Sequence, residues 1–226
     1  MTAVIHPLKV VHVEKLAPQI IQILLKPEHP IAYASGQYIM LGFDSEDLKP
    51  FSIASAPRED GLIECHIRNQ DDSEWMRALF AVQTGDHVVM QGPKDQMQLQ
   101  PAHQPIIFVA GGTGFAPMKA LLDSLLKQGT GVPVHFYWGA RSVADLYQHD
   151  NMVALMQTHA NLEYIPVISG QAEQWNGLTG LVHEQVLQRH PNLQHTTVYM
   201  CGPWPMMQKA KIDFLAAGID PVHLIC

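Results

Sequence analysis

The apolar residues of this 226-residue chain change their periodicity near residue 100, and this change limits the folds that the chain can adopt. Before it, apolar runs are short, rich in Val and Ile, and separated by Pro, Gly and Asp, as in antiparallel strands. Only residues 74–82 have helical spacing there, with Ser73 as an N-cap residue in front of them. The six strand-like runs cover residues 10–13, 20–25, 38–41, 51–54, 62–67 and 88–90.

After a polar, proline-containing stretch at residues 99–105, strand-like runs alternate with helical ones. This alternation is typical of a parallel sheet with helices on both faces. We therefore predict a six-stranded antiparallel β-barrel domain over residues 1–101, followed by a five-stranded, parallel, doubly wound α/β domain over residues 102–226. The expected strands are residues 106–110, 134–138, 162–167, 198–201 and 223–225, and the expected helices are 116–127, 151–159, 181–188 and 205–217.

Charge and cysteine content exclude several classes of function. Charged residues make up 15% of the chain, the net charge is −7, and no block of Lys and Arg could follow a nucleic acid or an anionic membrane. No stretch is apolar enough to span a bilayer, and residues 1–16 lack the apolar core of a signal peptide, so we expect a cytoplasmic protein. Cys65, Cys201 and Cys226 are odd in number and far apart, which predicts no metal centre.

A glycine-rich turn follows the first strand of the parallel sheet. Gly111, Gly112, Thr113 and Gly114 stand between residues 106–110 and a helix with Pro117 in its first turn. Such a turn lets a ligand approach the backbone, and the free N–H groups of the helix start attract phosphate. The segment lacks the third glycine of G-x-G-x-x-G and the Lys of a P-loop, so neither an ordinary Rossmann enzyme nor an NTPase is indicated.

Three motifs in order give the chain a family resemblance: Lys49-Pro50-Phe51-Ser52, residues 111–117, and Cys201-Gly202-Pro203. Together they resemble the ferredoxin–NADP reductase superfamily, in particular the bacterial NAD(P)H:flavin oxidoreductases and luciferase-associated flavin reductases, over nearly the whole chain. The resemblance implies that the barrel binds a flavin, either FAD or FMN, and that the α/β domain binds NADH or NADPH. It also implies that the small molecules flavin and nicotinamide dinucleotide are the substrates.

The resemblance implies roles for particular residues. Lys49 would face the flavin phosphate, the ring of Phe51 would lie against the isoalloxazine, and the hydroxyl of Ser52 would bond near N5, which makes Ser52 the catalytic residue. Arg141 would lie at the adenosine ribose, where it is compatible with a 2′-phosphate or an unphosphorylated ribose. The other implied contacts are Pro50, His66, Ile67, Arg68 and Ser73 for flavin, residues 111–114 for the dinucleotide, and Cys201, Gly202 and Pro203 for the nicotinamide.

Two departures from the family pattern concern the flavin phosphate. Lys49 replaces the usual Arg and cannot grip a phosphate with two parallel hydrogen bonds, and Asp71 and Asp72 occupy the loop that usually contacts the pyrophosphate. Arg68 would offset these acids in part, and a solvated loop is an equally good reading of them. The departures favour flavin as a released substrate over FAD as a permanent group.

The expected function is an NAD(P)H-dependent flavin reductase, which moves a hydride from nicotinamide C4 to flavin N5 and releases reduced flavin to an acceptor. One alternative is a reductase component with tightly bound FAD that passes electrons to a separate monooxygenase or ferredoxin. A second is a nucleotide-binding regulatory or electron-transfer subunit without catalysis. The sequence leaves open the identity of the flavin, the choice between NADH and NADPH, the acceptor and the oligomeric state.

Overall fold

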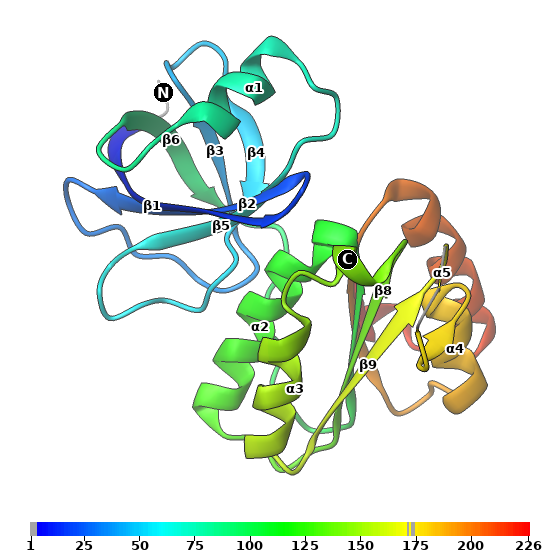
Figure 1. Cartoon of the computed structure of the whole chain (residues 1–226). Helices are drawn as coiled ribbons and strands as arrows, with labels where there is room; N and C mark the ends of the chain where they lie inside the picture. Colours follow the sequence, from blue (N-terminus) through cyan, green and yellow to red (C-terminus); the bar gives the residue numbers. More distant parts are fainter. Residues whose placement is uncertain (1–3, 171, 173–174) are drawn as a thin grey trace. The chain divides into compact units, whose positions relative to one another are not determined.

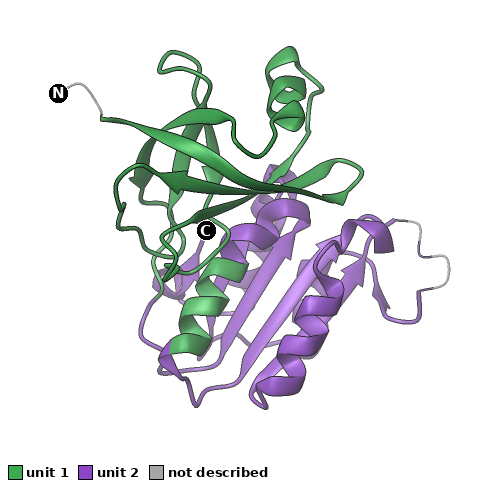
Figure 2. Cartoon of the chain, turned by 60° about the vertical axis from the view of Figure 1, so that its left-hand side comes forward, with its two compact units in different colours: residues 1–99, 119–127 green, residues 100–118, 128–226 purple. Residues whose placement is uncertain are grey.

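The computed structural model of the protein describes residues 4–170, 172 and 175–226. The chain separates into two compact units, which Figure 2 colours differently. Unit 1 contains residues 1–99 and 119–127, and unit 2 contains residues 100–118 and 128–226. Helix α2 (Phe115–Gln128) therefore contributes to both units. The first three residues of the predicted barrel domain lie outside the described residues.

Unit 1 contains the predicted six-stranded antiparallel sheet, in the order β4-β3-β6-β1-β2-β5. The strands alternate buried Val, Ile and Leu side chains with more exposed ones, so one face of the sheet lines the core. Register shifts near residues 11 and 16 bend β1, which is how a long strand curves around a barrel. The strands are β1 (Ile5–Ala17), β2 (Ile20–Pro27), β3 (Tyr38–Gly42), β4 (Lys49–Ser52), β5 (Ile63–Arg68) and β6 (His87–Lys94).

The barrel closes where its two edge strands meet. Directly after β4, Ile53 forms an isolated antiparallel bridge with Cys65 of β5, and the Ala54 N–H donates to the Glu64 carbonyl at 2.7 Å. Among the described residues, no further strand pairing joins β4 to β5. Because the bridge is antiparallel, Ser52 and His66 stand on its same side, along the unpaired parts of the two strands.

The predicted helix of the barrel half is α1 (Glu74–Ala81). The Ser73 hydroxyl accepts a hydrogen bond from the Met76 N–H at 3.2 Å, which confirms the predicted N-cap. Met76 and Leu79, one turn apart, are buried and contribute to the barrel core.

Unit 2 contains a parallel sheet in the order β10-β9-β8-β7-β11-β12. The five predicted strands are present, and a sixth, β10 (Leu178–Thr179), pairs with β9. Two residues are too few to produce a hydrophobic periodicity, so no sequence pattern predicts this strand. The other strands are β7 (Ile106–Gly111), β8 (Val134–Ala140), β9 (Leu162–Ile168), β11 (Thr197–Cys201) and β12 (Leu224–Ile225).

The helices of unit 2 lie within a few residues of the predicted ranges and cover both faces of the sheet, as Figure 1 shows. Helices α4 (Val182–Arg189) and α5 (Trp204–Ala216) pack on the face formed by Ile107, Val109 and Met200. Helix α3 (His149–Thr158) covers the opposite face, where the rings of Phe108, Phe136 and Tyr199 stack. This arrangement confirms the doubly wound fold.

The strand order decides where a ligand can bind. The chain moves from β7 through β8 to β9 in one direction and places β11 on the other side of β7. Open α/β sheets bind ligands at such a reversal, outside the carboxyl ends of the strands. The loops after β7, β8 and β11 lie at this edge. No helix within the described ranges is long and apolar enough to cross a lipid bilayer.

Candidate functional site

The loops after β7 and β11 pack backbone against backbone. Strand β7 is buried throughout and continues into a 3-10 turn at Gly112–Gly114, after which α2 begins. A Cβ atom on Gly114 would collide with the carbonyl group of Cys201, and a Cβ on Gly202 would lie 3.0 Å from the Gly111 Cα atom. These glycines are therefore required by the packing of the protein itself, in addition to the close ligand approach that the sequence suggested.

A group of aromatic rings supports the glycine turn. The indole N–H of Trp138, at the end of β8, donates to the Gly112 carbonyl at 2.9 Å. The Trp138 ring stacks on Phe115 with centroids 4.0 Å apart, and Tyr147 meets both rings edge-on. In the sequence, the segments with Trp138 and Tyr147 resemble family landmarks, but they indicate no packing role, because a buried aromatic side chain is an ordinary core residue. They fix the backbone that would face a phosphate.

Cys201 ends β11 and contributes its carbonyl to the contact with Gly114. Burial raises the pKa of the Cys201 thiol to about 11, so the side chain is a neutral thiol at physiological pH. A neutral thiol packs against a ligand but is a poor nucleophile. Pro203 follows as the residue before α5 and lies close to Gly111, which completes the contact between the loops.

Arg141 directly follows β8 and is exposed. Its carbonyl accepts a hydrogen bond from the Gly170 N–H at 3.1 Å, which fixes the backbone. The next residue, Ser142, donates its hydroxyl to Asp145 at 2.8 Å and caps a short 3-10 turn. Within the described part of the chain the Arg141 guanidinium has no ion pair, so it can reach a ligand. All predicted dinucleotide contacts thus lie on three neighbouring loops of unit 2.

The predicted flavin motif forms β4, whose residues alternate between two faces. Lys49 and Phe51 share one face, where the Phe51 ring stacks on Trp75 with centroids 6.0 Å apart, and the Lys49 ammonium lies 4.7 Å from the Trp75 ring centroid. Pro50 and Ser52 belong to the opposite face. Sequence reasoning placed Trp75 on the helix but gave it no part in the site. Its contact with Lys49 is a cation–π interaction that competes with phosphate for the ammonium group.

Strand β5 presents the remaining predicted flavin contacts. The His66 imidazole is fully buried, and its Nε2 atom lies 2.9 Å from the Glu64 carboxylate. Burial lowers the pKa of His66, so the ring is neutral and its backbone is the part left for a ligand. The side chain of Ile67 belongs to the barrel core, and Arg68, at the end of the strand, is half-buried.

The acidic loop after β5 folds around the start of α1. Asp71 accepts a hydrogen bond from the Ser73 N–H at 3.0 Å, and the hydrogen bonds from Ser73, helped by the charge of Lys49, lower the pKa of Asp71. Asp72 pairs with Arg77 at 3.2 Å, so Arg77 partly neutralises the loop, a role that the sequence had suggested for Arg68. Nothing in the sequence distinguished Arg77, because its partner depends on the left-handed backbone of Asp72.

The two groups of residues differ in chemistry. In unit 1, the Ser52 hydroxyl and unpaired strand backbone lie beside the closure of the barrel, which suits a planar ring with a polar edge. The Lys49 ammonium belongs to the opposite face of β4. In unit 2, backbone N–H groups and glycines suit a dinucleotide phosphate. No cluster of His, Cys, Asp or Glu in the described ranges could hold a metal ion.

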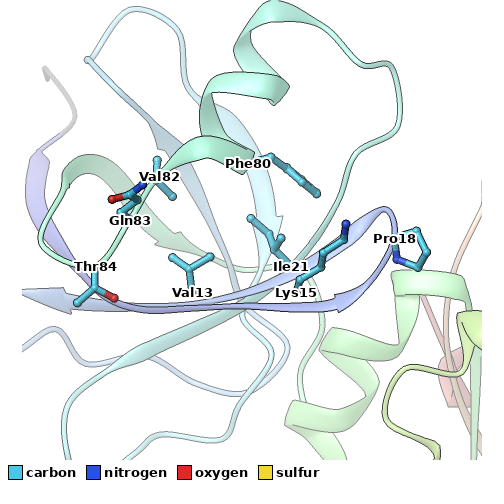
Figure 3. A pocket seen from close by; sticks show the side chains of 8 residues that line it. All are labelled: Val13, Lys15, Pro18, Ile21, Phe80, Val82, Gln83 and Thr84. Carbon is cyan, nitrogen blue, oxygen red and sulfur yellow. The ribbon is translucent and has the colours of Figure 1, made fainter.

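A shallow hollow lies elsewhere on unit 1, between the β1–β2 hairpin and the end of α1 (Figure 3). Its walls combine apolar side chains with the polar residues Gln83 and Thr84, and Lys15 is its charged residue. None of its residues belongs to the predicted flavin contacts. The lining residues are Val13, Lys15, Pro18, Ile21, Phe80, Val82, Gln83 and Thr84.

A chain that contains an antiparallel barrel and a doubly wound sheet, each with its own candidate nucleotide-type site, defines a class of two-domain flavin- and nicotinamide-dependent oxidoreductases. Comparison with known proteins agrees. Residues 7–99 match the family model of the oxidoreductase FAD-binding domain, and residues 108–211 match that of the oxidoreductase NAD-binding domain.

Curated relatives span the same regions. An NAD(P)H-flavin reductase of Vibrio harveyi is 33% identical over 91% of this chain and 90% of its own length. The anthranilate 1,2-dioxygenase electron transfer component of Acinetobacter baylyi is 31% identical over 85% of this chain and 57% of its own. The chain belongs to the NAD(P)H-flavin reductase family of FAD- and NAD-binding oxidoreductases.

Solved structures confirm the fold at lower identity. An Amycolatopsis cytochrome P450 reductase superposes with a TM-score of 0.89 at 24% identity, over all of this chain and 70% of that one. A ferredoxin NADP⁺ reductase of Neisseria gonorrhoeae with bound FAD and NADP has a TM-score of 0.80 at 20% identity, over 95% of this chain and 92% of that one.

Proposed function

We propose that this protein uses NADH or NADPH to reduce free flavin and then releases the reduced flavin to an acceptor. When bound, the nicotinamide supplies a hydride at C4 and the flavin accepts it at N5. The protein binds and orients both rings and keeps water out, and no side chain needs to act as a nucleophile. The neutral thiol of Cys201, a poor nucleophile, is consistent with a reaction that needs no nucleophilic side chain.

The observation that carries the proposal is the position of Lys49 on β4. The one cation of the motif, Lys49, lies over the Trp75 ring and in the field of Asp71. Ammonium groups make no bidentate phosphate contacts, and the carboxylate repels an approaching phosphate. The hydroxyl of Ser52 and the backbone of β5 would therefore hold the isoalloxazine while the rest of the flavin is held loosely. Loose binding permits exchange of oxidised for reduced flavin.

The residues that we propose as contacts are those predicted from the sequence. Ser52 would bond at N5 as the catalytic residue. Ser73, which also caps α1, would contact the flavin. The other proposed flavin contacts are Lys49, Pro50, Phe51, His66, Ile67 and Arg68. The dinucleotide would contact Gly111, Gly112, Thr113, Gly114, Arg141, Cys201, Gly202 and Pro203.

A visible absorption spectrum and a turnover assay test the proposal. We expect purified protein to be colourless after desalting and to oxidise NADH or NADPH only when FMN, FAD or riboflavin is added. A yellow protein that retains equimolar FAD through desalting would overturn flavin release. Absence of turnover with every pair of substrates would overturn the enzyme assignment.

A second candidate is a reductase component with bound FAD that delivers electrons to a separate monooxygenase or ferredoxin. The observation in its favour is the similarity to the anthranilate dioxygenase electron transfer component. The chain spans about 60% of several relatives of this kind, so their partners are proposals here. A cytoplasmic location is also proposed, and the three unpaired cysteines suit a reducing compartment.

A further inference from the structure

Lys119, which is not among the predicted site residues, donates a hydrogen bond to the backbone that follows the predicted flavin motif. The ammonium of Lys119, on the part of α2 that belongs to unit 1, lies 3.2 Å from the Ala54 carbonyl oxygen. The same ammonium bonds to the Asp123 carboxylate at 2.8 Å and lies 3.9 Å from the Glu64 carboxylate. The Lys119 side chain is 23% exposed. Sequence patterns gave it no role, since a lysine on a helix usually faces solvent.

The partner of this lysine on β5 is held in place from several directions. The Glu64 carboxylate is 5% exposed and accepts hydrogen bonds from Gln22 at 2.8 Å and Arg58 at 3.3 Å, with His66 at 2.9 Å. Although burial raises the pKa of Glu64, the His66 hydrogen bond and the charge of Lys119 bring it down to about 2. A fixed negative charge therefore lies beside the ammonium at any physiological pH.

The backbone that Lys119 contacts is the continuation of the flavin motif. Ala54 is two residues after Ser52, and its N–H already donates to the Glu64 carbonyl at 2.7 Å. The preceding Ile53 N–H donates to the Gln37 carbonyl at 3.0 Å, and the Ser55 hydroxyl lies 3.0 Å from the hydroxyl of Tyr33. Lys119 therefore fixes the Ala54 carbonyl in a segment whose neighbouring groups are bonded to the barrel.

We propose that Lys119 is a positioning residue of the reductase, which holds segment 52–55 so that the Ser52 hydroxyl meets the reacting atom of the flavin. This inference rests on the proposed function. Rate depends steeply on such placement, because a displacement of about 1 Å can cost on the order of a hundredfold. The Glu64 carboxylate anchors the lysine, and Ser124 bonds to Ser35 and holds the same stretch of helix on the barrel.

The first test uses the protein without flavin. Hydrogen–deuterium exchange in a peptide covering residues 52–56 should become about fivefold faster in Lys119→Met, because segment 52–55 loses its side-chain support. Lys119→Gln, which retains an N–H donor but no charge, should show a smaller increase. Lys127→Met, an exposed lysine on the same helix, is the matched control and should leave exchange unchanged. Equal exchange in Lys119→Met and the wild type would overturn the inference.

A kinetic cycle separates positioning from general damage to the fold. Lys119→Met should lower kcat about tenfold while the KM for the nicotinamide dinucleotide stays the same, and Lys119→Arg should restore much of the rate. In a Ser52→Ala background, Lys119→Met should have little further effect, since both act through one hydroxyl. If the fold losses in kcat of Lys119→Met and Ser52→Ala multiply in the double variant, the inference is overturned while the reductase proposal stands. An inactive wild type would overturn the reductase proposal and the inference together, and a lower melting temperature with unchanged kcat would overturn the inference alone.

Discussion

At the scale of single residues, the two sites depend on side chains whose states the structure defines. Ser52 belongs to the face of β4 opposite Lys49 and Phe51, and no described residue accepts or donates a hydrogen bond at its hydroxyl. That hydroxyl is therefore available to a ligand. We propose that this hydroxyl acts on the reacting atom of a flavin, because a hydroxyl can both donate and accept a hydrogen bond. In unit 2, Cys201 is a neutral thiol.

Replacing Ser52 with Ala should lower kcat by about tenfold or more and leave the KM for NADH nearly unchanged, because the lost hydrogen bond acts on the reacting atom. Steady-state kinetics with saturating flavin measures both constants. Ser45→Ala, at an exposed loop position, serves as the control. Wild-type turnover in Ser52→Ala would remove Ser52 from the catalytic role.

Arg141 provides a test of cofactor preference. We expect Arg141→Gln to raise the KM for NADPH about tenfold and that for NADH much less, because only NADPH has a 2′-phosphate for a guanidinium to bind. The ratio of the two KM values is the measurement, and Lys26→Gln, on the barrel surface, controls for the loss of one positive charge. Equal effects on both dinucleotides would place Arg141 at a part of the ligand that the two share.

At the scale of elements, the candidate nucleotide site consists of two loops that pack against each other without a ligand. The turn after β7 and the loop after β11 are in contact through Gly114 and the Cys201 carbonyl. The Trp138 indole N–H donates a hydrogen bond to the Gly112 carbonyl of the same turn. Substitution of Gly114 is therefore a test of loop packing first and of nucleotide binding second.

Gly114→Ala should lower the free energy of unfolding by about 1–3 kcal/mol, because the new methyl group must push the Cys201 backbone away. Chemical denaturation followed by fluorescence gives this value. Gly131→Ala is the matched control, since a Cβ there meets no atom within 4 Å. Similar stability of the two variants would show that the β11 loop moves freely away from the turn.

At the scale of the whole molecule, the chain consists of two compact units with separate cores, and the predicted boundary between residues 101 and 102 stays a prediction. Buried histidines occur in both. Burial lowers the pKa of His66 in unit 1 and of His135, His183 and His190 in unit 2. His183 is almost fully buried between α4 and α5, with its Nε2 atom 3.3 Å from Asp213.

These histidines predict a loss of stability in mild acid. Their pKa values are lower in the folded state than in the unfolded chain, where histidine has a pKa near 6.5, so the unfolded chain binds more protons as pH falls. The stability that they contribute is complete above about pH 6.5 and is lost as pH falls toward their folded values. The melting temperature should therefore decrease between pH 7.5 and pH 5.5.

A pair of variants assigns part of this effect. His183→Gln should reduce the decrease in melting temperature, because one buried titrating group is gone, whereas His195→Gln, at an exposed position, should leave it as in the wild type. A melting temperature that is flat across this pH range would contradict the assignment of neutral, buried histidines.

The sequence by itself determined the order and type of nearly all elements and the motifs of both sites. Short Val- and Ile-rich runs and Ser73 before residue 74 are local signals, and so are the glycines at 111–114, because each depends on residues close together in the chain. These signals sufficed to predict the barrel, the doubly wound sheet and the resemblance to flavin reductases. The two-residue strand β10 was not predicted, because its formation depends only on pairing with β9.

Only the tertiary structure decided which side chains meet. Lys119 and Glu64 are 55 positions apart, Lys49 and Trp75 belong to a strand and a helix, and Gly114 touches Cys201 across two strand ends. Such contacts arise from the register and closure of sheets, which depend on the burial of many side chains at once and leave no mark at any single residue. The motifs predict the chemistry of each candidate site, and the contacts that hold each motif in position come from elsewhere in the chain.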